Sequence, residues 1–242
     1  MQWRENSIVL SSRLFSENFR IVTVFNRTFG KTSGLVRGLK IPIHPGDISD
    51  VSWNGRTAEQ LGTFKIENIF SPFTYILGDS NRIFAVESAS FLCSKGLPEK
   101  APHQALFDSL RTLLLSIPRE NWLINYALFE VSFLSEVGSG LDLSKCALSG
   151  RTENLFYISP RTGCAATKEA GEKYKRNLFV LPQFLVSKNS CPVDRDVFSA
   201  LKITGHFLKM HFYGINNGKL PLSRDFLTAE LTKSLKGVEC EN

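Results

Sequence analysis

The first 80 residues alternate short apolar runs with turn residues, a pattern typical of small β-domains. The clearest run is 19–25, which is rich in β-branched residues and leads into a turn at Gly30. Residues 34–40 form the expected return strand. Further strands are expected at 7–10, 51–53 and 61–66. About five short strands in a segment of this length predict a small barrel of the OB type.

Positive charge is concentrated in the same segment. Residues 1–40 carry seven basic and two acidic side chains, a net charge of +5, and the whole chain carries +6. Residues 41–80 have the opposite balance, with two basic and five acidic side chains. A basic face on a small β-domain is typical of proteins that bind the phosphate backbone of nucleic acids. The alternative is a solvated outer face without a partner.

Six basic side chains are the candidate contacts to the phosphates of a nucleic acid: Arg13, Arg20, Arg27, Lys31, Arg37 and Lys40. Arg13 is the weakest of these candidates. Contacts of this kind read no base sequence, and the affinity they supply falls steeply with salt. Aromatic residues lie between them, and exposed rings favour single strands, whose bases stack on aromatic side chains. Phe29, near the predicted turn, is the best stacking candidate. The alternative for Phe29 is a place in the core, where strand aromatics usually lie.

The pattern changes from strands to helices near residue 80. Apolar residues then recur at three- and four-residue spacings, as in amphipathic helices. The helical segments are expected at 83–91, 102–117, 122–137, 196–212 and 222–235. The sequence therefore predicts an α+β protein, with an OB-fold domain over residues 1–80, whose charge favours nucleic-acid binding, and a mainly helical domain over residues 81–242.

Motifs for covalent catalysis are missing from the sequence. It has no G-x-x-x-x-G-K-[ST] phosphate loop, no H-E-x-x-H and no G-x-S-x-G. His206 and His211 are five residues apart, which places them on different faces of a helix, so we expect no shared metal. Glu87 and Glu130 lie on apolar helices, where ion pairing is favoured over acid–base chemistry. We expect a protein that is not an enzyme.

The cysteines and the apolar runs indicate the compartment. Five cysteines, an odd number and widely spaced, argue against a disulfide framework and favour the cytoplasm. The sequence has no apolar run long enough for a transmembrane helix. Its first residues also lack the apolar core of a secretory signal, so no membrane association is expected.

Residues 141–182 have the outline of a zinc ribbon without its ligands. A structural zinc site needs four ligands, usually two C-x-x-C pairs. The position three residues after Cys146 is Ser149, and the position three residues after Cys164 is Thr167. Because hydroxyl groups are poor zinc ligands, we expect no metal and no other cofactor.

Several short motifs, in a fixed order along nearly the whole chain, are similar to those of one protein family. They lie at 36–40 (VRGLK), 53–55 (WNG), 159–163 (SPRTG), 204–208 (TGHFL) and 220–224 (LPLSR). The chain resembles RecO, a family of bacterial recombination mediators and DNA repair proteins. The most specific of these motifs is the one at 159–163.

The resemblance implies an OB domain, a helical domain and, in many members, a four-cysteine zinc element. It also implies binding to single- and double-stranded DNA and annealing of complementary strands. The implied partners are RecR and the acidic C-terminal tail of the single-stranded DNA-binding protein (SSB). Through its contacts with RecR and SSB, a RecO protein helps RecA to load onto SSB-coated gapped DNA in the RecF pathway. No covalent catalysis is implied.

The family's zinc pattern does not carry over to this sequence. The second ligand pair would fall on Thr167 and Ala170, so only Cys146 of the four ligand positions is retained. An acidic tail that ends in apolar residues requires an apolar pocket with a nearby cation. Candidate cations are Lys145, Arg151 and Arg161; the alternative is that they are plain surface charges.

Two other functions stay open from the residues alone. One is a protein–protein adaptor whose basic face binds an acidic partner without annealing DNA. The other is an enzyme acting on nucleic acid through an unrecognised site, which the scattered acidic residues support little.

Overall fold

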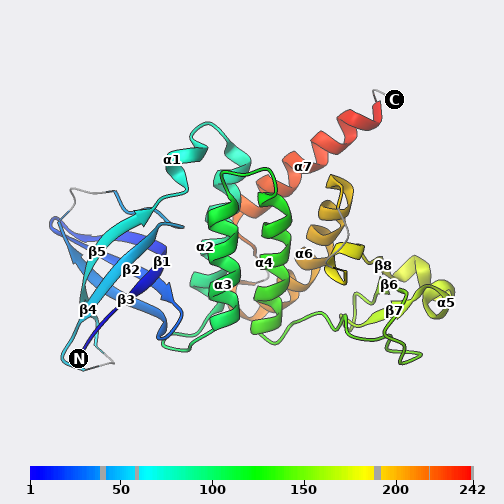
Figure 1. Cartoon of the computed structure of the whole chain (residues 1–242), viewed down its shortest axis with the longest axis horizontal. Helices are drawn as coiled ribbons and strands as arrows, with labels where there is room; N and C mark the ends of the chain where they lie inside the picture. Colours follow the sequence, from blue (N-terminus) through cyan, green and yellow to red (C-terminus); the bar gives the residue numbers. More distant parts are fainter. Residues whose placement is uncertain (39–41, 58–59, 188–191, 218, 241–242) are drawn as a thin grey trace. The chain divides into compact units, whose positions relative to one another are not determined.

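A computed structural model describes residues 1–38, 42–57, 60–187, 192–217 and 219–240 (Figure 1). Strands dominate the N-terminal part and helices the rest, which confirms the predicted α+β class. The chain divides into two compact units, Met1–Trp122 and Leu123–Asn242. Each unit is described by itself. Among the described residues, no helix combines the length and the apolar character needed to cross a membrane.

Five strands at the start of the first unit close into a barrel (Figure 1). They are β1 (Gln2–Ser16), β2 (Phe19–Asn26), β3 (Gly30–Arg37), β4 (Ile48–Asn54) and β5 (Gly62–Phe70). The strand order around the barrel is β1-β2-β3-β5-β4, and β4 pairs with β1 to close it. Only the β3–β5 pair is parallel among these strands. The closed barrel confirms the predicted OB-type domain.

The barrel interior is filled by alternate residues of its strands, as the two-residue period of a strand requires. Side chains that point inward form one buried cluster: Val9, Val22, Val24, Val36, Val51, Trp53 and Phe64. The intervening residues of β2 and β3 point outward. This alternation separates the barrel core from an outer face, part of which is itself covered, since Phe25 and Lys31 point outward and are buried.

Three helices complete the first unit: α1 (Phe73–Ile76), α2 (Ser80–Gly96) and α3 (Gln104–Ser116). The Asp79 side chain caps α2 by accepting a hydrogen bond from the Arg82 backbone N–H. On α3, Phe107 packs edge-on against Phe25 of β2, with ring centroids 5.6 Å apart. The barrel ends at Phe70, near the expected end of the DNA-binding domain, whereas the compact unit continues through α3.

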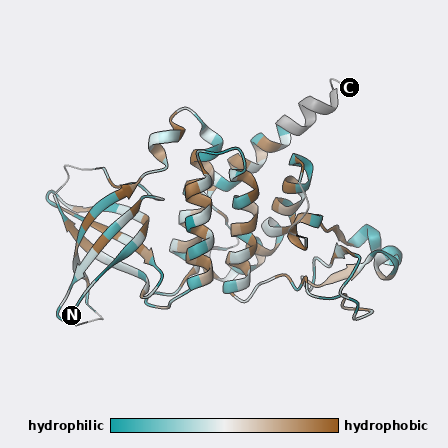
Figure 2. Ribbon diagram, viewed as in Figure 1, coloured by the Kyte–Doolittle hydropathy of each residue, from teal (hydrophilic) through white to brown (hydrophobic). Residues whose placement is uncertain are grey.

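Helices dominate the second unit: α4 (Trp122–Glu136), α6 (Asp194–Asn216) and α7 (Leu222–Cys240). Between α4 and α6 lies a small sheet of order β7-β6-β8, made of β6 (Leu155–Ile158), β7 (Ala165–Thr167) and β8 (Phe179–Val180). The short helices α5 (Lys168–Gly171), η1 (Glu172–Asn177) and η2 (Gln183–Leu185) complete the unit. Figure 2 shows that the segment around α5 is mainly hydrophilic, whereas α4 is rich in hydrophobic residues.

Candidate nucleic-acid interface

The outer face of β1, β2 and β3 carries two arginines among polar and apolar side chains, with Phe19 opposite Arg37 and Leu35 opposite Ile21. Arg13 pairs with Ile21, and Thr23 pairs with Ser33, so these side chains lie on one face. The Thr23 and Ser33 hydroxyl oxygens are 3.0 Å apart, within hydrogen-bond distance. Arg37 follows on the same face of β3, and both arginines are exposed. We call the surface formed by Arg13, Ile21, Thr23, Ser33 and Arg37 the basic face.

Two of the predicted contacts lie outside the basic face. Arg20 is half-buried, and its Nη1 donates to Ser12 Oγ at 3.1 Å. Arg27 is exposed and pairs with Asp108 of α3, with Nε 3.2 Å from Oδ1. Because both partners of that pair are about half exposed, water screens it and it is worth little.

The structure contradicts the predicted phosphate contact of Lys31. Its side chain is buried, and Nζ donates to the Ser94 carbonyl oxygen at 2.7 Å. Ser94 lies in the last turn of α2, where carbonyls lack helical partners and attract cations. Burial lowers the pKa of Lys31. Lys31 therefore joins the barrel to α2 and is not part of the interface, while Lys40 lies outside the described residues.

Phe29 lies at the exposed end of an aromatic stack. It follows the turn after β2, where its backbone N–H donates to Asn26 Oδ1 at 2.6 Å, and its side chain is 39% exposed. Its ring stacks on Trp3 with centroids 5.1 Å apart. Trp3 stacks in turn on Trp53, which is its cross-strand partner on β4, at 6.2 Å. The sequence indicated Phe29 but gave no sign that Trp3 and Trp53 stack with it.

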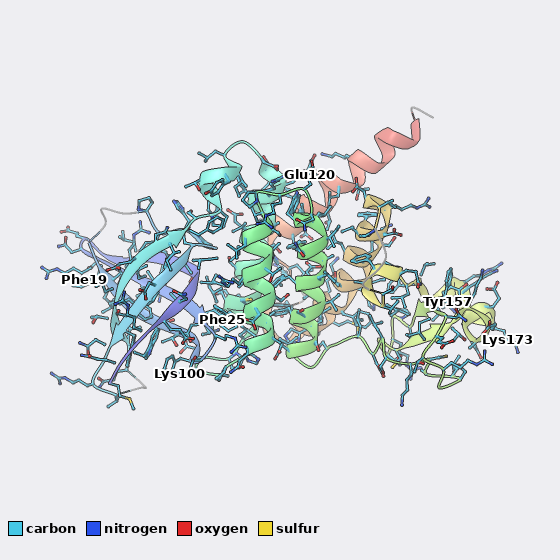
Figure 3. All side chains as sticks on the ribbon, viewed as in Figure 1. Phe19, Phe25, Lys100, Glu120, Tyr157 and Lys173 are labelled. Atoms are coloured by element: carbon cyan, nitrogen blue, oxygen red, sulfur yellow. The ribbon has the colours of Figure 1, made fainter. Side chains whose placement is uncertain are left out.

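Lys100 is a cation that the sequence analysis missed. Its backbone N–H donates to the Lys31 carbonyl oxygen at 2.8 Å, which attaches the segment after α2 to β3. Gly30 permits this approach, because a Cβ there would lie 2.1 Å from the Ala101 carbonyl oxygen. The exposed Lys100 side chain lies on a hollow of about 360 Å³ together with Arg13, Thr23 and Ser33 (Figure 3 labels Lys100). The acidic Glu99 also lines this hollow, and its carboxylate accepts a hydrogen bond from the Ser33 hydroxyl at 3.4 Å.

The four positions that the resemblance gives to zinc ligands gather around Cys146, although no zinc was predicted for this sequence. This buried thiol accepts hydrogen bonds from the backbone N–H groups of Ser149 and Thr167, each at 3.4 Å. Thr167 Oγ1 accepts from the Ala170 backbone N–H at 3.4 Å and caps α5. The four positions therefore offer one thiol, two hydroxyls and one methyl group, a set that does not fit zinc. Elsewhere in the described chain, no group of three or more His, Cys, Asp or Glu side chains is placed to hold a metal.

The surroundings of Cys146 favour its thiolate. Burial raises the pKa of the thiol, but hydrogen bonds from the Ser149 hydroxyl and from the backbone amides of Thr167, Ser149 and Leu148 outweigh that effect. Together they lower the pKa to about 6. Peptide N–H donors and the Ser149 hydroxyl thus stabilise negative charge on the Cys146 sulfur.

The predicted tail-binding cations are spread over the surface of residues 145–161. Lys145 and Arg161 are exposed, and Arg151 forms a 3.5 Å pair with Glu169. A hollow of about 540 Å³ between α6 and α7 has other cations at its wall. It is lined by residues that include Phe198, Leu201, Lys202, Lys209 and the acidic Asp225. Lys202 Nζ lies 4.5 Å over the Phe198 ring, so a cation and an apolar surface stand together here.

The remaining titratable candidates have structural roles. Glu130 is fully buried and pairs with Arg224, which confirms the favoured ion-pair interpretation, whereas Glu87 is exposed. His206 Nε2 lies 2.8 Å from the Pro160 carbonyl oxygen. His211 Nδ1 lies 3.3 Å from Ser139 Oγ. The two histidines therefore contact different segments.

Two family models match consecutive parts of the chain. The model described as Recombination protein O N terminal matches residues 1–73, and Recombination protein O C terminal matches residues 77–221. The chain belongs to the RecO family. The two RecO models meet shortly after the barrel ends, close to the domain boundary expected at residue 80.

Similarity to proteins of the RecO family extends over most of the chain. The DNA repair protein RecO of Rhodospirillum centenum is 36% identical over 231 residues, which cover 93% of this chain and 92% of that protein. The protein of the same name from Caulobacter vibrioides strain NA1000 is 34% identical over 243 residues, 98% of this chain and all of the relative. The Anaplasma marginale (strain Florida) protein is 36% identical over 219 residues.

Proposed function

We propose that this RecO family member binds DNA as a mediator of recombination and repair and is not an enzyme. The family and the name of its relatives, DNA repair protein, support this role. The observation that carries the proposal is the position of Arg13 and Arg37, which are exposed on one outer face of β1–β3. OB folds bind oligonucleotides on the face of strands 2 and 3.

Strand annealing has a simple physical account on such a surface. Arginine side chains neutralise phosphates and release counterions, which lowers the repulsion between two DNA strands. The contacts go to the backbone, so single and double strands of any sequence bind. Base pairing between complementary strands then supplies the free energy, and no nucleotide is consumed.

The hollow between α6 and α7 is the proposed docking site for the acidic tail of SSB. A peptide of this kind needs an apolar surface beside a cation, and Phe198 with Lys202 provides both. This hollow replaces Lys145, Arg151 and Arg161 as the site to test first. Contact with SSB and with RecR would place the protein on coated, gapped DNA, where RecA is loaded. The proposed compartment is the cytoplasm, with association to the nucleoid during repair.

Residues 141–182 are proposed to fold without zinc. The ligand set around Cys146 supports this, since only one of its four side chains is a good zinc ligand. Metal analysis of the purified protein should find less than one zinc per chain. Unfolding temperature should be the same with and without a chelator, and a chelator-induced loss of structure would refute the proposal.

DNA binding across a salt series tests the basic face. In the double variant Arg13→Ala/Arg37→Ala, the slope of log affinity against log salt should fall by about 1.4 for single strands, or about 0.7 per lost contact. The matched control Lys173→Ala/Arg176→Ala removes the same charge from exposed positions of η1. An unchanged slope in the first variant, or an equal change in both, would contradict the proposed interface.

A further inference from the structure

A cavity of about 300 Å³ opens beside the aromatic stack, on the barrel of the first unit. Trp3, Phe29 and Trp53 form much of its wall. Thr32 and the exposed Lys100 add polar groups. Small-molecule sites span roughly 300–1,000 Å³, so this cavity is of a size to take one flat molecular fragment.

We infer that this cavity receives a single unpaired nucleobase of a bound DNA strand. The inference rests on the proposed function, because it assumes that the barrel binds DNA, and it goes further by naming the chemical group and the residues that hold it. Aromatic rings stack on bases of every kind, so the site needs no sequence preference. Bases in a duplex are already paired and stacked, so the cavity distinguishes single from double strands.

The aromatic wall is fixed before any ligand arrives. The Trp3 ring lies at 18° to Phe29 and at 12° to Trp53, and Phe64 meets Trp3 edge-on at 6.0 Å. Gly62 leaves room for the Trp53 indole, since a Cβ at that position would lie 2.3 Å from Nε1. Rings that are already packed lose little conformational freedom on binding, and this lowers the cost of stacking a base.

Lys100 connects the cavity to the basic face. It lines this cavity and also the neighbouring hollow that contains Arg13, Ser33 and the acidic Glu99, so the hollow carries two basic side chains and one acidic one. A strand whose phosphates lie along the basic face therefore passes the opening of the cavity. Lys100 is placed to neutralise the phosphate next to the inserted base.

The test compares two single-stranded oligonucleotides with the same phosphates. One is a short thymidine oligonucleotide, and the other is its abasic counterpart. The intact protein should bind the abasic strand about tenfold more weakly, since stacking of one base is lost while the charge is unchanged. Phe29→Ala should abolish this difference and leave affinity for duplex DNA unchanged.

Phe15→Ala is the matched control, because Phe15 is 61% exposed on the same barrel and is not part of the cavity wall. It should keep the tenfold difference. Equal binding of both strands by the intact protein, or a difference that survives Phe29→Ala with the fold intact by circular dichroism, would overturn the inference while the proposed function stands. A folded protein that binds neither strand nor duplex would overturn the proposed function itself.

Discussion

Arg224 binds both carboxylate oxygens of Glu130 inside the second unit, with Nε 2.7 Å from Oε1 and Nη2 2.9 Å from Oε2. Neither side chain is more than 5% exposed. Arg224 Nη2 also donates to the Leu201 carbonyl oxygen at 2.8 Å, and the Thr204 hydroxyl donates to the carboxylate. Because these residues come from α4, α6 and α7, one ion pair joins the three long helices of the unit.

Removal of one partner from this pair should be costly. Glu130→Ala leaves the Arg224 guanidinium buried without its counter-charge, and we expect the free energy of unfolding to fall by about 3–5 kcal/mol. Glu87→Ala, on the exposed face of α2, should change it by less than about 0.5 kcal/mol. Urea denaturation followed by circular dichroism measures both. Similar small changes in the two variants would show that the pair contributes little.

Cys146 should make stability depend on pH. Its folded pKa of about 6 lies below its ordinary value of 9.0, so between these values the unfolded chain holds a proton that the folded chain has released. Stability should therefore increase as pH rises from 6 to 9, and this contribution should be lost as pH falls through 6. Cys146→Ser should flatten the dependence.

The thiolate absorbance of the folded protein tests the same titration directly. The absorbance should rise near pH 6 in the intact protein and in the Cys164→Ser control, and it should not rise there in Cys146→Ser. A rise that is retained in Cys146→Ser would assign the titration to another group.

Lys31 should affect stability and not DNA binding. Lys31→Ala leaves the Ser94 carbonyl without its charged donor, and we expect a loss of about 1–3 kcal/mol in the free energy of unfolding. The salt slope of DNA binding should be unchanged, whereas Arg37→Ala should reduce it by about 0.7 for single strands. A reduced slope in a folded Lys31→Ala variant would return this residue to the interface.

The hollow between α6 and α7 should bind an acidic peptide through Lys202. Lys202→Glu should lower the affinity for a fluorescent acidic peptide with an apolar end about fivefold, the effect of one exposed charge pair. Lys145→Glu is the control with the same change in charge, and it should leave the affinity unchanged. A loss of affinity in Lys145→Glu and none in Lys202→Glu would favour the site around Lys145 that was predicted from the sequence.

The barrel and the helices were predictable because their signals are local. The β-branched run of β2 and the turn residue Gly30 predict a hairpin from a few neighbouring residues. Helix α4 was expected at 122–137 and is found at Trp122–Glu136, since its apolar stripe and the glycine that follows are both visible in the sequence. Such elements can be predicted without the tertiary fold, because the residues that determine them are close together in the sequence.

The interface was only partly predictable because it depends on distant contacts. The sequence around Lys31 resembles that around the other basic residues of the strands. Its burial depends on the C-terminal end of α2, where the Ser94 carbonyl oxygen accepts from the Lys31 ammonium group. Lys100 lies far from the barrel strands in sequence and reaches them through a backbone hydrogen bond to Lys31. Trp53 joins Trp3 through strand pairing between β1 and β4. Charge and aromatic content alone could not show which basic residues are exposed on the barrel surface or which aromatic rings stack on one another.

Annealing of two complementary fluorescent oligonucleotides tests the central claim most directly. The purified protein, without nucleotide or metal, should accelerate annealing, and the acceleration should fall as salt rises and weaken in Arg13→Ala/Arg37→Ala. A folded protein that neither binds DNA nor accelerates annealing at any salt concentration would contradict the account. That result would leave a protein–protein adaptor, with its basic face toward an acidic partner, as the function to pursue.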